Sequence, residues 1–135
     1  MIQSGEDLQS GDELTSSSKE YVLRLNTDGT LLLYKGEDLL WTSGAKNIGS
    51  APYKLSMQKD NHLILRNNDS VEVWATGVYI GRDGNAWEKG GYAILQDDGN
   101  FVVYDGNGIA MWDTQTYDGQ KNVLDGHGKR RMLGL

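Results

Sequence analysis

Residues 96–104 read Gln-Asp-Asp-Gly-Asn-Phe-Val-Val-Tyr. The Asp98-Gly99 pair predicts a tight β-hairpin turn, and β-forming residues flank it on both sides. Because side chains alternate between the two faces of a strand, every second residue should share one face. This face would carry two amides, a carboxylate, a small apolar group and a phenol, from Gln96, Asp98, Asn100, Val102 and Tyr104. The set pairs no nucleophile with a base, so it suits binding of a polyhydroxylated ligand better than catalysis.

The same frame occurs twice more in the chain. The first copy consists of Asn26, Asp28, Thr30, Leu32 and Tyr34, with its turn at Asp28-Gly29. The second copy consists of Gln58, Asp60, His62, Ile64 and Arg66, with its turn at Asp60-Asn61. A tryptophan follows each copy at a similar distance, at Trp41, Trp74 and Trp112. These copies form an internal threefold repeat, which is a stronger guide to the architecture than any single predicted strand.

The repeats predict an all-β domain of three antiparallel units, at about residues 20–43, 53–76 and 92–114. Apolar residues alternate with the polar positions and should face a shared core: Leu31, Leu33, Leu63, Leu65, Phe101 and Val103. One small sheet cannot bury its apolar face alone, whereas three sheets around an axis can. The tryptophans following the repeats could be platforms that stack on sugars, but their apolar neighbours favour packing in this core.

The amino-acid composition agrees with a domain of many short strands. The chain has 135 residues, of which 18 are glycine and 38% are hydrophobic. This length suits a single compact domain with its own core. No helical period is sustained after residue 20, so long amphipathic helices are not expected.

Charge and cysteine content disfavour several classes of protein. The formal net charge is −6, which opposes binding to nucleic-acid phosphates. The chain has no cysteine, so we expect neither a disulfide nor a thiolate metal site. No calcium-loop pattern occurs, and we predict no metal or cofactor. We expect no membrane insertion because no segment is apolar enough to span a bilayer. Signal-peptide features are also lacking, which favours synthesis in the cytosol, with release to the outside left open.

The residues at 96–104 resemble the mannose-binding signature of the bulb-type, or monocot mannose-binding, lectins, of which the snowdrop lectin is typical. The resemblance covers roughly residues 1–118 and includes the Ser4–Leu8 segment, the three hairpins and the tryptophan that follows each of them. It implies a β-prism II fold: three antiparallel sheets around a pseudo-threefold axis, with one potential sugar site on each sheet. Plant members usually carry a disulfide, and the matching positions here are Gly29 and Tyr53.

The resemblance also implies how the third repeat would bind mannose. Asp98 would accept, and Asn100 donate, hydrogen bonds at the axial O2. Gln96 would reach O3, the Tyr104 hydroxyl would reach O4, and Val102 would pack against the C3–C4 edge. Partners would therefore be mannose-containing glycans or glycoproteins.

The first two repeats depart from this pattern and are candidates for weaker sugar binding only. Asn26 is shorter than glutamine by about 1.5 Å, and Thr30 offers a single hydroxyl donor. Arg66 stands where the third repeat has a tyrosine, and we expect it to pair with Asp60. The weaker candidates are Asn26, Asp28, Thr30, Leu32, Tyr34, Gln58, Asp60, His62 and Ile64.

Residues 119–135 form a C-terminal extension, either exchanged between subunits or disordered. Family dimers exchange their C-terminal strand, so the resemblance implies a homodimer. The extension contains the basic cluster Lys129-Arg130-Arg131, which favours a solvated end over an electrostatic tail. The longer connection at residues 78–90 contains Trp87 and is either a specificity loop or a plain surface loop.

Two other classes of function are alternatives to a lectin. The first is a structural or protein-interaction module in which sugar binding is lost or secondary. The second is an enzyme, which the sequence does not favour. The only histidines, His62 and His127, have no motif partner, and Asp97 and Asp98 would point to opposite faces of an extended strand.

Overall fold

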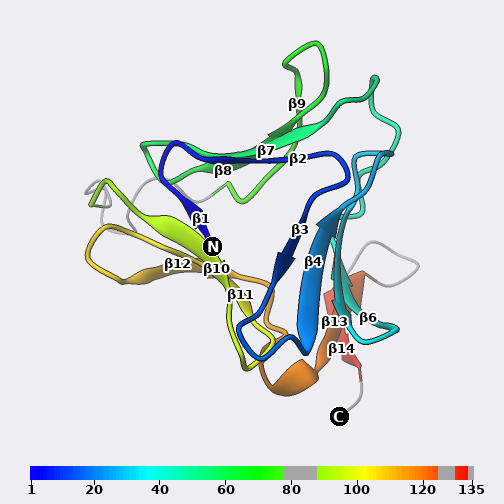
Figure 1. Ribbon diagram of the computed structural model, residues 1–135, viewed down its shortest axis with the longest axis vertical. Coiled ribbons are helices and arrows are strands. Elements are labelled where there is room, and N and C mark those ends of the chain that lie inside the picture. The colour runs from blue at the N-terminus through cyan, green and yellow to red at the C-terminus, as the bar shows by residue number, and fades with distance from the viewer. Residues whose placement is uncertain (78–87, 125–129, 134–135) are drawn as a thin grey trace.

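The computed structural model describes residues 1–77, 88–124 and 130–133. Three four-stranded antiparallel sheets form the sides of a triangular prism (Figure 1). The first sheet contains β3 (Glu13–Thr15), β4 (Tyr21–Leu25), β5 (Leu31–Lys35) and β6 (Asp38–Thr42). The second contains β2 (Asp7–Gln9), β7 (Lys54–Met57), β8 (Leu63–Arg66) and β9 (Glu72–Ala75). The third contains β1 (Ile2–Gln3), β10 (Tyr92–Leu95), β11 (Phe101–Tyr104) and β12 (Ala110–Asp113).

The predicted fold class is confirmed: the chain is a β-prism with three equivalent hairpins. Each central hairpin pairs its two strands across the predicted turn, for example Leu95 with Phe101 in the third sheet and Leu25 with Leu31 in the first. Each sheet also has a register shift before the residue that the repeats align with Tyr104. Among the described residues no helix is long or apolar enough to cross a membrane.

The N-terminal segment supplies one edge strand to each sheet, an arrangement that the sequence analysis did not predict. Strands β1, β2 and β3 pair with β10, β7 and β4, respectively. The segment repeats every six residues, with Gln3-Ser4-Gly5-Glu6 echoed by Gln9-Ser10-Gly11-Asp12. In both turns the acidic side chain accepts a hydrogen bond from the backbone N–H of the glutamine, at 2.7 Å from Glu6 and 3.0 Å from Asp12. These turns carry the chain from one sheet to the next.

Three tryptophans meet in the interior, as the core-packing interpretation predicted. The rings of Trp41, Trp74 and Trp112 contact one another edge to face, with centroid distances of 5.6–5.9 Å. Around them lie the predicted inward residues, which are at most 1% exposed: Leu31, Leu33, Leu63, Leu65, Phe101 and Val103. Each sheet therefore contributes one tryptophan to a hub that none could bury alone.

The three hairpin turns each pack against the start of the next repeat. The Gly29 turn lies against the Tyr53 ring, which is 2.6 Å from the position a Cβ on Gly29 would occupy. Asn61 accepts a hydrogen bond from Gly91 N–H at 2.8 Å. The Gly99 turn lies against Tyr21 in the first repeat and so closes the ring. Gly29 and Tyr53, the two positions that the resemblance predicts to match the plant disulfide, thus lie against each other here through an aromatic ring.

Replacing Gly99 by alanine should destabilise the protein by about 2–4 kcal/mol in urea unfolding. Gly99 has a φ of +92°, which disfavours any side chain, and a Cβ there would lie 2.5 Å from the Tyr21 ring. Gly5→Ala is the matched control, because Gly5 has a φ of +88° but open space around its Cβ position. Equal losses for the two variants would contradict a role for the Tyr21 contact.

The C-terminal segment folds back on the first sheet. After a short 3₁₀ turn, η1 (Tyr117–Gly119), strands β13 (Lys121–Leu124) and β14 (Arg130–Leu133) pair with each other. Strand β13 lies beside β6 of the same chain (Figure 1). Arg130 and Arg131 of the basic cluster lie at the start of β14, and a solvated end stays a prediction. Trp87, His127 and Lys129 lie outside the described residues.

Candidate functional site

The turn of the third hairpin is built by hydrogen bonds that leave the Asp98 side chain exposed. Gln96 and Asn100 close the loop through Gln96 N and Asn100 O at 2.9 Å, and Gly99 N donates to Gln96 O at 2.9 Å. The Oδ1 atom of Asp98 accepts the backbone N–H of Asn100 at 2.8 Å. Within the described chain the other carboxylate oxygen of Asp98 has no hydrogen-bond partner, so it can accept from a ligand.

The outer face of the third sheet brings Gln96, Val102 and Tyr104 together beside this turn. The Gln96 side-chain amide donates to the Tyr104 hydroxyl across the hairpin. The Tyr104 ring stacks on its cross-strand neighbour Tyr92, with centroids 5.3 Å apart. Val102 is only 3% exposed and forms an apolar floor between the polar groups. The amide and phenol are thus held in fixed positions by the sheet itself.

Asn100 is the most constrained member of the set. It is 7% exposed, and its Oδ1 accepts hydrogen bonds from Thr114 Oγ1 and Thr116 N, both at 3.2 Å. Its Nδ2 donates to Asp113 Oδ2 at 2.8 Å. Thr116 also donates from its hydroxyl to Gly99 O at 2.7 Å, which ties the segment after β12 to the turn. The amide oxygen is therefore held by the protein interior, and the amide nitrogen is turned toward Asp113.

The repeat pattern did not predict the three residues that hold Asn100, which are Asp113, Thr114 and Thr116. Asp113 and Thr114 directly follow Trp112, and their equivalents follow the other two tryptophans. The signal that could have identified Asp113 is its chemical type, since the other repeats have Thr42 and Ala75 at this position.

The first hairpin has the same backbone geometry but different side-chain contacts. Asp28 Oδ1 accepts the Thr30 N–H at 3.0 Å, as Asp98 does for Asn100. The Thr30 side chain is 6% exposed, and its buried hydroxyl has no partner among the described residues. The Thr30 hydroxyl therefore does not face solvent, unlike the donor that the sequence analysis envisaged. Arg24 covers the Tyr34 ring, with its guanidinium 6.0 Å from the centroid. Asn26 and Leu32 are partly exposed on this hairpin.

In the second hairpin the polar side chains form hydrogen bonds within the hairpin and with one another. Asp60 Oδ1 accepts the His62 N–H at 3.0 Å, and His62 Nε2 accepts the Gly77 N–H at 3.1 Å. With the Gln58 amide oriented to satisfy both of its ends, its oxygen accepts from both terminal nitrogens of Arg66 at 3.1 Å. The same amide donates to Asp60 Oδ1 at 3.3 Å. The predicted Arg66–Asp60 pair is therefore wrong: the guanidinium meets Gln58, which stands across the hairpin from it.

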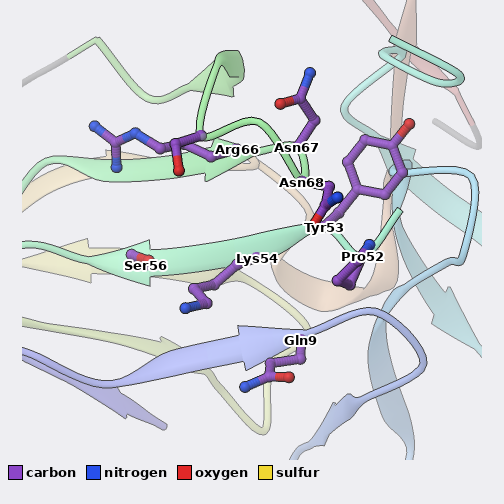
Figure 2. A pocket seen from close by; sticks show the side chains of 9 residues that line it. Gln9, Pro52, Tyr53, Lys54, Ser56, Arg66, Asn67 and Asn68 are labelled. Carbon is purple, nitrogen blue, oxygen red and sulfur yellow. The ribbon is translucent and has the colours of Figure 1, made fainter. Parts of the chain in front are cut away.

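A pocket of about 350 Å³ lies on the outer face of the second sheet. Figure 2 shows Lys54 and Ser56 on β7 with Arg66 on the neighbouring strand, and Asn68 at the far end. Lys54 and Arg66 are direct cross-strand partners, where the third sheet has Tyr92 and Tyr104. Lys54 Nζ lies 3.9 Å from Asp7 Oδ2. Ile64 is 4% exposed. This face therefore offers two cations in place of the tyrosine pair.

No site for a metal ion is evident in the described part of the chain. It contains no group of three or more histidine or acidic side chains placed to hold one. The polar groups of the third sheet are instead hydrogen-bond donors and acceptors on an open surface, which suits a ligand rich in hydroxyl groups.

Comparison with solved structures defines the class of protein. The chain superposes on a monomeric monocot mannose-binding lectin from Gastrodia elata with a TM-score of 0.73 and 28% identity, covering 86% of this chain and 96% of that one. It matches the snowdrop (Galanthus nivalis) mannose-specific agglutinin, solved with methyl-α-D-mannoside, with a TM-score of 0.63 and 28% identity over 86% and 95% of the two chains. The fold is thus the β-prism II of these lectins.

Within that class, the predicted resemblance to the bulb-type lectins is confirmed by these structures. Lectins bind carbohydrate without catalysing a reaction, which agrees with the expectation that the chain is not an enzyme. A putative lectin of Acanthamoeba polyphaga mimivirus is 27% identical over 64 residues, which are 46% of this chain and 32% of that protein. The match therefore spans about a third of the viral relative's length. No protein-family model matches the chain.

Proposed function

We propose that this protein is a lectin that binds α-mannose or mannose-rich glycans at the outer face of its third sheet. The observation that carries the proposal is that only the third hairpin has Gln, Asp, Asn, Val and Tyr together at the repeated positions, with its amide and phenol joined. The structural similarity to a snowdrop lectin solved with methyl-α-D-mannoside supports this class of ligand. The first and second hairpins have other residues there and contribute weak binding at most.

Each side chain of the third site has a role that its geometry supports. The unpaired oxygen of Asp98 accepts from the axial O2 hydroxyl of mannose, and the remaining Nδ2 hydrogen of Asn100 donates to the same oxygen. Gln96 meets O3, the Tyr104 hydroxyl meets O4, and Val102 packs under the C3–C4 edge. An equatorial O2, as in glucose, leaves the carboxylate and amide poorly paired, at a cost of about 1–3 kcal/mol.

The affinity for a single sugar should be weak because the site is shallow and open. A dissociation constant on the order of millimolar corresponds to about −4 kcal/mol. Several sites that engage one branched glycan can raise the strength by a factor of about 10²–10⁴. A homodimer formed through the C-terminal strand would multiply the sites, and this dimer stays a prediction. The boundary between a lectin domain at residues 1–118 and an extension at residues 119–135 also stays a prediction.

The direct test is an NMR amide titration of the labelled protein with methyl α-mannoside to tens of millimolar. We expect saturating shifts centred on residues 96–104, with smaller or no shifts at residues 26–34 and 58–66. Methyl α-glucoside is the control and should give no saturating response. If none of the three hairpins responded to the mannoside, simple mannose recognition would be refuted.

A protein-interaction module is the second candidate function. The observation in its favour is that the second hairpin directs its polar groups at one another, as with Gln58 and Arg66. Such a module would bind its partner independently of Asp98, so the substitution of Asp98 described below distinguishes the two candidates.

A further inference from the structure

We propose that Asp113 is a specificity-determining residue of the third site, where it both orients Asn100 and adds a second carboxylate that accepts sugar hydroxyls. The inference rests on the proposed function of this sheet as a sugar site. It adds a residue outside the five repeated positions, on the strand next to the one that carries Val102 and Tyr104.

The position of Asp113 follows from the pairing of β11 with β12. Asp113 is the direct cross-strand partner of Val102. Its neighbour Trp112 points inward to the tryptophan hub, so Asp113 faces outward with Val102. The carboxylate is partly buried and stands beside the apolar floor of the site.

The contact with Asn100 gives Asp113 its positioning role. Asn100 Nδ2 donates to Asp113 Oδ2 at 2.8 Å, a charge-assisted hydrogen bond of the stronger kind. One Nδ2 hydrogen is used in this bond, and one remains for a ligand. On the other side of the amide, Thr114 and Thr116 hold the oxygen. Asp113 thus fixes the direction in which the remaining N–H points.

Two carboxylates consequently flank Asn100. Asp98 accepts the backbone N–H of Asn100 from the turn, and Asp113 accepts its side-chain N–H from β12. A third acidic residue nearby, Asp97, points elsewhere and accepts the Ser18 N–H at 2.8 Å. A carboxylate has about four acceptor positions, so both Asp98 and Asp113 keep capacity for hydroxyl donors. The paired negative charges favour neutral sugars with neighbouring hydroxyl groups and disfavour acidic sugars.

The other two sheets lack this arrangement. In the first sheet the equivalent residue is Thr42, whose hydroxyl accepts the Gly44 N–H at 3.1 Å and is used locally. In the second sheet it is Ala75, which has no polar side chain. The extra carboxylate therefore belongs to the sheet that also keeps all the repeated sugar-binding residue types.

The test compares Asp113→Ala and Asp113→Asn with the unchanged protein by mannoside titration. Asp113→Ala should weaken binding at least about tenfold, the loss of one charge-assisted hydrogen bond. Asp113→Asn keeps an acceptor for Asn100 but loses the charge, so its affinity should fall between those of the unchanged protein and Asp113→Ala. Its tolerance of methyl α-mannuronide, an acidic sugar that keeps the axial O2, should rise. Thr42→Ala is the matched control and should leave binding at residues 96–104 unchanged.

A measurement without sugar tests the contact itself. The side-chain NH₂ signals of Asn100 should shift in Asp113→Ala in the absence of sugar, because one of these hydrogens donates to the Asp113 carboxylate in the unchanged protein. The backbone N–H of Asn100 reports Asp98 separately, because it donates to that carboxylate.

The outcomes separate this inference from the proposed function. Unaltered mannoside affinity in Asp113→Ala, alongside normal binding by the unchanged protein, would overturn the role of Asp113 and leave the lectin function standing. Absence of mannoside binding by the unchanged protein would overturn both. Asn100 side-chain NH₂ signals that do not change in Asp113→Ala would overturn the positioning role.

Discussion

Trp41→Ala should destabilise the protein by about 3–5 kcal/mol, the cost of removing a buried tryptophan from a packed core. Trp41 is 1% exposed, and its ring lies 5.7 Å from that of Trp74 and 5.9 Å from that of Trp112. Its loss leaves a cavity where the three sheets meet, and edge-to-face contacts are lost with it. Urea unfolding followed by circular dichroism would give the change in midpoint and slope.

The control for this variant is a large apolar residue that is exposed. Ile109 is 53% exposed, so Ile109→Ala should change the free energy of unfolding by less than about 0.5 kcal/mol. If Trp41→Ala cost no more than this control, the tryptophan hub would not be what joins the sheets. Trp41→Phe, which keeps an aromatic ring, should fall between the two.

The central hairpins were predictable because their signals are local. The run of β-forming residues in Phe101–Tyr104 and in Tyr21–Leu25 is a local strand signal, and the structure forms strands β11 and β4 there. The repeated tryptophans predicted a common core, because three similar units each had an apolar face to bury. A threefold repeat thus supplied the tertiary information that a single hairpin lacks.

The N-terminal strands were missed because they have almost no local signal. Strand β1 contains Ile2 and Gln3 alone, and β2 and β3 have three residues each. Such short segments are extended only because β10, β7 and β4 offer edges to pair with. Each of these strands has one apolar residue, and these residues are six positions apart. In the sequence they therefore look like isolated apolar residues in a polar stretch.

The hydrogen bonds within the site could not be predicted, because sequence spacing does not reveal which side chains meet across neighbouring strands. The bond between Asn100 and Asp113 crosses from the turn to the next strand, in a sheet whose register shifts between Val103 and Tyr104. The pairing of Arg66 with Gln58 likewise required knowing which side chains project together across the hairpin. Residue types could therefore single out the third repeat as the candidate binding face, but they could not say which hydrogen bonds its members already make.

Asp98→Ala should abolish detectable binding of methyl α-mannoside while leaving the protein folded. In the proposed site the exposed oxygen of Asp98 is the charged acceptor for O2, and losing such a bond weakens binding by a factor of about 10–100. Starting from a millimolar constant, that change moves saturation beyond the titration range. The measurement is the amide titration at residues 96–104, with the unfolding midpoint recorded for each variant.

Asp28→Ala and Asp60→Ala are matched controls, because each removes the same turn contact from another repeat. In all three turns the aspartate accepts the backbone N–H two residues later, at 2.8–3.0 Å. The three variants should therefore lose similar stability, about 0.5–1.5 kcal/mol. Only Asp98→Ala should lose the sugar response of the third hairpin. If Asp98→Ala still bound mannoside, this carboxylate would not belong to the site. If Asp98→Ala lost sugar binding but still bound a protein partner, the interaction module would be favoured.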